Sequence, residues 1–364
     1  MNKKIYGLVA LVLIVGTWAY FNNKNQNTTA SQVTIGVIAG TTGDYAVVGE
    51  NWIKGANVAL DEWNMAHPEK QVKLIIEDDG FNAAKGLSAY KKITNLNKVD
   101  AIYNMTSPTI DAIYNDVVKQ GIPLVQFGEQ GIDPKDDNVF QVLEGNVVTE
   151  QALGTYAKNK GYKNIAVFVS NNATFERFYK GFADGYDGEH KVYRINPGDT
   201  SIKTEVLKAL SEKPDAVAIL MVPPDGAVVA REVNVLNPND MPLLLDGSVY
   251  TGWSEYEKLL GDTNILNGDP VVMLKQTAVS KTFESAYKTK YNEDLGVGSV
   301  WGYDGLTFLL GTMSDDASDH KTWIYNMKTK QVSGATGVIK FDAVGVRLPE
   351  FYIGTISGGK LPTQ

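Results

Sequence analysis

Hydrophobic and polar residues follow two periods along most of the chain, one typical of buried strands and one typical of amphipathic helices. Residues 33–38 read VTIGVI, a run of β-branched and apolar residues that predicts a strand covered on both faces. A glycine-bearing loop follows, and from Ile53 to Asn64 apolar residues return every three or four positions. Because ligands of open α/β sheets lie beyond the carboxyl ends of the strands, residues 41–49 are the first candidate for a binding loop.

The same alternation continues and then restarts. In the first part, strands are expected at 71–77, 100–103 and 123–127, with helices at 83–95 and 107–119. A loop rich in Gly, Asp and Pro is expected at 128–137. In the second part, strands are expected at 164–170, 191–195, 216–221 and 242–245, with helices at 148–159, 175–186, 201–210 and 226–234. This alternation predicts an α/β fold of two similar Rossmann-like lobes with parallel-rich sheets.

After residue 245 the chain is expected to return toward the first lobe through one further strand. A strand at 271–274 leads to helices at 281–291 and 299–313, and the last strands are expected at 337–341 and 350–356.

The amino terminus has a different pattern. Lys3 and Lys4 precede an apolar run at 5–21, which is typical of a secretion signal. An uncleaved membrane anchor is the alternative, because aromatic residues at the end of the run suit a membrane interface. Residues 1–32 are therefore expected to be a signal peptide or anchor plus a polar linker. Both alternatives place the folded part outside the cytoplasmic membrane, periplasmic, secreted or tethered.

Composition argues against several classes of function. The chain has 364 residues, enough for two domains, and a formal net charge of -8, which argues against nucleic-acid binding. It has no cysteine, which excludes disulfides, thiol catalysis, thiolate metal sites and a lipoprotein-type lipid anchor. Its three histidines are scattered among charged or loop-type neighbours, so neither a metal nor another cofactor is expected.

Sequence patterns of known catalytic sites are missing. The chain has no G-x-S-x-G, P-loop or H-E-x-x-H motif, and the loop GTTGDYAVVG does not fit G-x-G-x-x-G. The acidic pair Asp78-Asp79 is expected to end a strand, and Asp315-Asp316 to lie in a polar loop. An enzyme is therefore not expected.

Five stretches of the chain carry sequence motifs, and the order in which they follow one another is also informative. They are TGDYAVVG with GANVALDEWN; VKLIIEDDGFNAAKGLSAYKKI with NKVDAIYNMTSPT; KNIAVFVSNNATFERFYKGF; FESAYKTKYNEDLGVGSVWGYDGLTFLL; and TGVIKFDAVGVRLPEFYIGTISGGK. In this order they resemble the type I periplasmic binding proteins, and among these the leucine/isoleucine/valine-binding branch that feeds ABC transporters. The resemblance covers nearly everything from Val33 onward.

The resemblance implies a fold and a mechanism. Two lobes are joined by a three-strand hinge, one lobe comprising residues 33–147 and 275–333, the other 148–274 and 334–364. A small polar solute, such as an amino acid or an amide, binds between the lobes, which close on it. An ABC permease in the membrane then receives the solute from the closed form, and the binding protein is expected to be a monomer. The rival in another class is a ligand-sensing receptor of the same fold, anchored by residues 5–21.

Carried over position by position, the resemblance also implies a set of ligand-binding residues. They are Tyr45, Val48, Thr106, Ser107, Gly128, Glu129, Gln130, Phe175, Pro223 and Asp246. Thr106 and Ser107 stand where the family has carboxylate-binding hydroxyls, although Ser107 is also suited to capping a helix. Asp246 is the candidate carboxylate for a cation, with capping of a turn as its alternative.

Three positions depart from the family's pattern. Val48 stands where branched-chain binders have an aromatic residue, and Tyr45 is a nearby source of that ring. Glu129 replaces a small residue, and Pro223 replaces an aromatic one. Phe175 stands at the position of the family's cleft tyrosine. These departures leave the identity of the ligand open.

Overall fold

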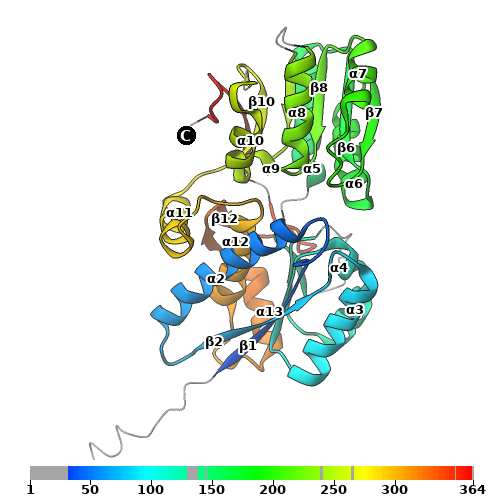
Figure 1. The fold of residues 1–364 in the computed structure, drawn as a ribbon. Helices are drawn as coiled ribbons and strands as arrows, with labels where there is room; N and C mark the ends of the chain where they lie inside the picture. The colour runs from blue at the N-terminus through cyan, green and yellow to red at the C-terminus, as the bar shows by residue number, and fades with distance from the viewer. Residues whose placement is uncertain are drawn as a thin grey trace, which may run out of the picture.

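Two α/β lobes, one above the other in Figure 1, make up the described part of the chain. The computed structural model describes residues 32–128, 138–143, 146–237, 241–263, 266–348 and 350–362. Each lobe has its own parallel-rich sheet, and hydrophobic clusters on both faces of each sheet join it to helices. The predicted two-lobed α/β architecture is confirmed.

The first lobe contains a five-stranded sheet in the order β2-β1-β3-β4-β5, in which all neighbouring strands are parallel. Its strands are β1 (Val33–Ala39), β2 (Val72–Asp78), β3 (Ala101–Asn104), β4 (Leu124–Gln126) and β5 (Val139–Gln141). All residues of β1 are buried, as a central parallel strand made of β-branched residues should be.

Helices from both ends of the chain cover this first sheet. On one face lie α3 (Ala83–Lys91), the π-helical turn Lys92–Asn97 and α4 (Ser107–Gln120). On the other lie α2 (Ala46–Ala66), α11 (Ala278–Tyr291), α12 (Ser299–Thr312) and α13 (His320–Thr329). Helices α2 and α12 approach so closely that a Cβ atom added at Gly302 would lie 1.9 Å from the carbonyl oxygen of Trp52. Only glycine allows this packing without a backbone shift.

The second lobe contains a six-stranded sheet in the order β13-β10-β9-β8-β6-β7, parallel except for the antiparallel pair β10 and β13. Its strands are β6 (Asn164–Ser170), β7 (Glu189–Ile195), β8 (Ala216–Leu220), β9 (Leu243–Leu245), β10 (Pro270–Leu274) and β13 (Phe351–Thr355). Its helices are α5 (Asn146–Lys160), α6 (Ala173–Gly185), α7 (Lys203–Ser211), α8 (Asp225–Leu236), α9 (Ser248–Thr251), α10 (Trp253–Leu260) and the 3₁₀ turn Gly261–Thr263.

Three segments connect the lobes, and they lie side by side. The amide of Gln141, where β5 ends, donates to the carbonyl oxygen of Gly345 at 2.8 Å, and the amide of Arg347 donates back to Gln141 at 3.0 Å. The amide of Lys275, after β10, donates to the carbonyl oxygen of Glu350 at 3.1 Å. The third segment thus hydrogen-bonds to the other two, which makes a three-stranded hinge.

Several elements differ from the predicted pattern. Strand β5 and helices α9, α10 and α13 were not expected, and α2 begins at Ala46, well before Ile53. The strand predicted at 337–341 is the shorter β12 (Gly337–Ile339), which pairs with β11 (Val332–Gly334) in a separate hairpin. Ile339 packs in the hydrophobic core of the first lobe. The chain therefore passes from the first lobe to the second for the last time nearer to residue 342 than to the predicted residue 334. The predicted lobe ranges otherwise stay a prediction.

The apolar run at 5–21 lies outside the described residues. Among the described residues, no helix has the length and hydrophobicity needed to cross a membrane.

Candidate functional site

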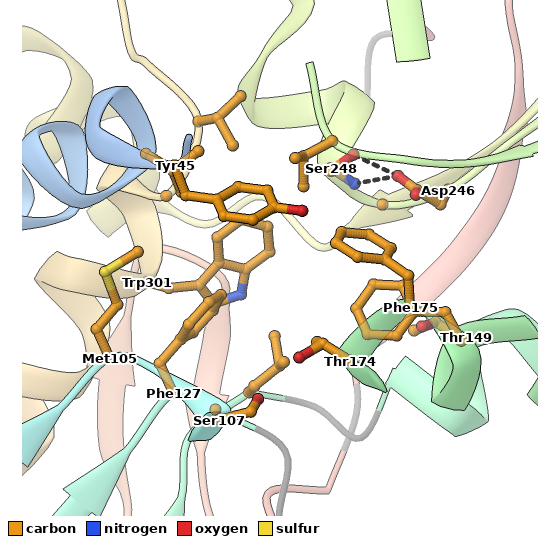
Figure 2. Close-up of a pocket in the computed structure, with 18 of the residues that line it drawn as sticks. Tyr45, Met105, Ser107, Phe127, Thr149, Thr174, Phe175, Asp246, Ser248 and Trp301 are labelled. Atoms are coloured by element: carbon orange, nitrogen blue, oxygen red, sulfur yellow. Dashed lines mark hydrogen bonds between the residues drawn. The ribbon is translucent and has the colours of Figure 1, made fainter. Parts of the chain in front are cut away.

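A cavity lies between the two lobes, where the carboxyl ends of the strands of both sheets meet (Figure 2). It encloses about 950 Å³ of empty space, part of which is open to solvent. Residues from both lobes line it, so the site is complete only when the lobes face each other as they do here.

The loop between β1 and α2 forms one wall of this cavity, and Asp78 holds it in place. Its carboxylate accepts hydrogen bonds from the amide of Thr41 at 2.8 Å, from the hydroxyl of Thr42 at 2.6 Å and from the amide of Gly80 at 3.1 Å. Burial works to raise the pKa of Asp78, but these hydrogen bonds outweigh it and lower the pKa to about 2. The loop is therefore fixed by a charged acceptor at all physiological pH values.

This fixed loop places Tyr45 at the start of α2, across the gap between the lobes (Figure 2). The ring packs against Phe81 with 4.7 Å between centroids, and its hydroxyl oxygen accepts a hydrogen bond from the Asn172 side chain of the other lobe at 2.7 Å. Burial, helped by the carboxylates of Asp225 and Asp44, raises the pKa of Tyr45 above its ordinary value. Tyr45 therefore remains a neutral hydroxyl that contacts both lobes.

Aromatic rings make up much of the rest of the wall. On the side of the first lobe, the ring centroids of Phe127 and Trp301 lie 5.4 Å apart. On α6 of the second lobe, the ring centroids of Phe175 and Phe178 lie 4.7 Å apart. Aliphatic side chains such as Val48 also line the cavity. The cavity therefore fits a ligand with a sizeable apolar or aromatic body.

Polar groups reach the cavity at a few points only. The hydroxyl-bearing residues Ser107, at the start of α4, and Thr174, in the first turn of α6, lie on one side, and Asp246 and Ser248 lie on the other (Figure 2). Backbone amides at helix starts favour negative or carbonyl groups of a ligand, whereas a carboxylate favours a cation.

Asp246 follows β9 and is only 1% exposed. One of its carboxylate oxygens, Oδ1, accepts from the amide of Ser248 at 2.8 Å and from the hydroxyl of the same residue. The other, Oδ2, has no hydrogen-bond partner among the described residues. Burial raises the pKa of Asp246 to about 7, although the hydrogen bonds from Ser248 oppose this shift. A cation in the cavity would stabilise the ionised carboxylate.

Six of the ten predicted ligand-binding residues line this cavity together: Tyr45, Val48, Ser107, Gly128, Phe175 and Asp246. Asp246 caps the turn at Ser248, as the alternative for this residue predicted, and it also lines the cavity. Its role as the carboxylate for a cation stays a prediction. Helix α4 begins at Ser107, and its N-cap residue is Thr106.

The other four predicted residues are placed differently. Thr106 is buried and donates its hydroxyl to Asp79 instead of lining the cavity. Pro223 does not line it either, and its neighbour Val222 takes that place. Glu129 and Gln130 lie outside the described residues.

Sequence reasoning missed much of the cavity wall. Among the missed residues are Phe81, Phe127, Phe178, Trp301, Thr149 and Glu150. Phe127 follows β4, and Thr149 and Glu150 lie in the first turns of α5. The rule that marked 41–49, which looks just beyond the carboxyl ends of strands, could have found Phe127 but not Thr149 or Glu150.

Within the described residues, no group of three His, Asp or Glu side chains is arranged to hold a metal ion.

Comparison with known proteins places these features in a family. Residues 32–359 match the family model for periplasmic binding proteins. The Leu/Ile/Val-binding protein BraC3 of Rhizobium johnstonii is 26% identical over 221 residues, which are 57% of this chain and 60% of that protein. Leu/Ile/Val-binding protein homolog 3 of Brucella melitensis is 25% identical over 251 residues, 64% of each chain. The chain thus spans less than two thirds of either relative.

Solved structures share the fold over nearly the full length. The branched-chain amino acid transporter substrate-binding protein LivJ of Streptococcus pneumoniae, in complex with isoleucine, aligns with a TM-score of 0.77 at 22% identity, covering 92% of this chain and 98% of that one. A solute-binding protein of an ABC transporter from R. palustris, in complex with benzoate, aligns with a TM-score of 0.79 at 20% identity, covering 91% and 95%. All four are proteins to which this chain is similar. The match to the family model over residues 32–359 confirms the predicted resemblance to periplasmic binding proteins.

Proposed function

Because the chain belongs to the periplasmic binding protein family, we propose that it captures a small solute between its lobes and delivers it to an ABC permease in the membrane. The ligand is an amino acid or a related amide with an apolar or aromatic side chain. Its amino group binds Asp246, its carbonyl or carboxylate group binds the side with Ser107 and Thr174, and its side chain packs among the rings.

One observation supports this proposal above the others. The Oδ2 atom of Asp246 is buried in a largely apolar cavity and has no hydrogen-bond partner in the described part of the chain. An unpaired carboxylate oxygen in such a place costs free energy, which a ligand ammonium group would recover through a charge-assisted hydrogen bond.

The relatives support the same ligand class without fixing it. Two relatives bear names of Leu/Ile/Val-binding proteins, and one structural neighbour holds isoleucine. Another neighbour holds benzoate, which is aromatic but has no amino group. The aromatic wall described above suits both kinds of body, whereas Asp246 favours a ligand with an amino group.

Thermal unfolding of the full-length protein tests the proposal. The protein is screened against amino acids, amides, amines, benzoates, sugars and nucleosides. A ligand present at about 100 times its Kd should add about 2.7 kcal/mol to the free energy of unfolding. An amino compound is expected to raise the melting temperature of the wild type and to have a much smaller effect on Asp246→Asn. A shift with sugars or nucleosides alone would contradict the proposed ligand class.

The receptor remains the alternative function, because the apolar run at 5–21 also suits a membrane anchor. Amino-terminal sequencing of the protein recovered from its own cells separates the two. Cleavage after the run, together with uptake that depends on a permease, supports transport. An intact amino terminus without permease-dependent uptake supports sensing.

A further inference from the structure

Trp301 presents to the cavity a buried hydrogen-bond donor that the proposed function does not use. Its side chain lines the cavity, is 6% exposed, and has an indole nitrogen, Nε1, without a hydrogen-bond partner among the described residues. Figure 2 shows this nitrogen directed into the open space between the lobes. An indole N–H is a donor only, and a buried donor without a partner costs free energy that a ligand acceptor would recover.

The packing of α12 holds this donor in place. A Cβ atom added at Gly55 of α2 would lie 1.8 Å from the carbonyl oxygen of Ser299, so the two helices touch just before Trp301. Gly302, directly after Trp301, makes the close contact with α2 described above. The carbonyl oxygen of Trp301 itself accepts a hydrogen bond from the buried hydroxyl of Tyr103. A donor fixed on a rigid element in this way is suited to discriminating between ligands.

The donor lies in the part of the cavity that would hold the side chain of the ligand. The ring of Trp301 packs against that of Phe127, with 5.4 Å between their centroids. Phe175 and Phe178 of the other lobe contribute further rings to the same cavity. The proposed function assigns the amino and carboxyl groups of the ligand to other residues, so the indole N–H faces the aromatic or apolar body.

This donor fits a neutral acceptor. An indole N–H supplies one hydrogen bond and no charge. The described lining residues include no Lys, Arg or His, so a second carboxylate on the ligand would meet no opposing charge from them. A ring nitrogen, or the oxygen of a phenol, ether or carbonyl group, needs only the hydrogen bond.

We propose that Trp301 is a specificity-determining residue, whose indole N–H selects amino acids with an aromatic side chain that carries a neutral hydrogen-bond acceptor. This inference rests on the proposed function and narrows its ligand class. A plain hydrocarbon ring, such as that of phenylalanine, would fill the same space but would leave the donor buried and unpaired. Sites built to hydrogen-bond a ligand group discriminate against ligands that lack it more strongly than apolar pockets discriminate by size.

Four amino acids of nearly the same shape test this inference. L-Phenylalanine is compared with its 2-, 3- and 4-pyridyl analogues, in each of which a nitrogen that accepts a hydrogen bond replaces one ring C–H. Binding to the full-length protein is measured by isothermal titration calorimetry at pH 8, where the pyridine nitrogen is neutral and Asp246, with a pKa of about 7, is mostly ionised. We expect the pyridyl analogue with the best-placed nitrogen to bind about fivefold or more tightly than phenylalanine, as one additional hydrogen bond allows.

Trp301→Phe keeps an aromatic ring and removes the donor. It should abolish the advantage of the best pyridyl analogue over phenylalanine, whatever happens to the affinity for all four. The matched control is Phe127→Leu, which changes the ring beside Trp301 and leaves the donor in place, so it should weaken all four to a similar degree and keep their ranking. If Trp301→Phe does not fold, as judged by circular dichroism, replacement of Trp301 by 3-benzothienylalanine, which has sulfur in place of the indole N–H, makes the same test with the ring shape kept.

The outcomes separate this inference from the function on which it rests. If phenylalanine binds the wild type as tightly as all three pyridyl analogues do, the selection is overturned, but an amino-acid-binding protein still agrees with the result. A preference for a pyridyl analogue that persists without the indole N–H, or that Phe127→Leu abolishes equally, contradicts the role given to Trp301. Binding of none of the four overturns the inference, and the wider thermal screen then decides the proposed function independently.

Discussion

At the scale of single residues, Asp246 combines burial with a position in the ligand cavity. Its pKa is raised to about 7 because the charged form loses solvation, against the opposing hydrogen bonds from Ser248. The hydroxyl of Tyr256 is also nearby, but burial and the charge of Asp246 raise the pKa of Tyr256 far above this range. Ionisation of Asp246 therefore falls within the pH range in which the protein can be studied.

Binding of a cationic ligand should depend on pH for this reason. At pH 6 about one tenth of the Asp246 carboxyl groups would be ionised, and at pH 8 most of them, given a pKa of about 7. We expect the affinity for a cationic amine to rise about tenfold from pH 6 to pH 8, measured by calorimetry in buffers of equal ionic strength. In Asp246→Asn the affinity should be low and nearly independent of pH. An affinity that falls as pH rises would contradict this assignment.

The free energy of unfolding of the unliganded protein, unlike the ligand affinity, should fall as pH rises. Because the folded-state pKa of Asp246 is about 7 and its ordinary value is 3.8, the folded state holds the proton more tightly. The contribution of this group to stability is therefore greatest below pH 4 and decreases as pH rises to 7. At about 1.4 kcal/mol per pKa unit, ionisation costs the folded state roughly 3–5 kcal/mol.

Asp246→Asn should remove this cost. We expect the unliganded variant to be more stable than the wild type at pH 8, with a smaller difference at pH 5, in urea unfolding monitored by tryptophan fluorescence. Glu257→Gln, at an exposed position of α10 in the same lobe, is the control, because it also removes one negative charge. A variant that is less stable than the wild type at pH 8 would show that the carboxylate is compensated in the unliganded state.

At the scale of elements, the loop from β1 to α2 depends on one side chain of the neighbouring strand. Asp78, the last residue of β2, accepts hydrogen bonds from backbone and hydroxyl groups of Thr41 and Thr42. Asp78→Asn would keep the shape but would lose the charged acceptor. We expect the free energy of unfolding to fall by about 1–3 kcal/mol, together with weaker ligand binding because Tyr45 is less well placed.

Hydrogen–deuterium exchange checks the local part of this prediction. Faster exchange should be confined to the loop at 40–45 and the start of α2. Asp184→Asn, at an exposed position of α6, controls for loss of a surface carboxylate. Unchanged exchange in this loop would argue that β1 and α2 hold it without Asp78.

The properties of single helices and strands also explain which of them could be predicted from the sequence. Strand β8 was predicted because it is an unbroken apolar run, and β1 because only Thr34 and Gly36 interrupt its β-branched apolar residues; both strands are fully buried. Helix α13 was missed because only Trp323 and Met327 are buried along it, which gives a single helical repeat. Strand β5 has three residues and follows a stretch rich in Gly, Asp and Pro, so no period can be measured in it.

The site is harder to predict than the elements, because it forms between lobes. Asp246 was predicted because it follows a strand and precedes a turn. Glu150 was not, since its helix α5 has almost no separation of polar and apolar faces and its sequence does not reveal which face meets the cavity. Only the packing of α5 against the second sheet, beside the first lobe, brings Glu150 and Asp246 to the wall of one cavity.

At the scale of the whole molecule, the polar contacts between described residues of the two lobes include one at Tyr45 and one at Arg177. The side chain of Asn172 donates to the hydroxyl oxygen of Tyr45 at 2.7 Å, and the guanidinium of Arg177 lies 3.3 Å from the carboxylate of Asp111. Both partners of the ion pair are more than a third exposed, so solvent screens it and its contribution is small. The ring of Tyr45, by contrast, also packs against the core of the second lobe.

Tyr45 should therefore contribute more to lobe closure than the ion pair does. Tyr45→Phe keeps the ring and removes the bridging hydroxyl, and the loss of one hydrogen bond of about 0.5–1.5 kcal/mol corresponds to roughly a 2- to 12-fold weaker affinity. We expect most of this change as faster ligand dissociation, because a closed complex must open before it releases its ligand. Stopped-flow displacement measures the rate, and small-angle scattering of the liganded and unliganded variant reports closure.

Arg177→Gln is the matched change at the other contact, and it should alter the dissociation rate less than twofold, since surface ion pairs contribute little. The hinge is not expected to respond to either variant, because its three segments are joined by backbone hydrogen bonds at Gln141 and Lys275, far along the chain from both contacts. If Arg177→Gln accelerates dissociation more than Tyr45→Phe, the ion pair at the rim, and not the tyrosine at the cavity, holds the lobes together. Equal and slow dissociation in both variants would instead attribute closure to the ligand itself, held between Asp246 and the aromatic wall.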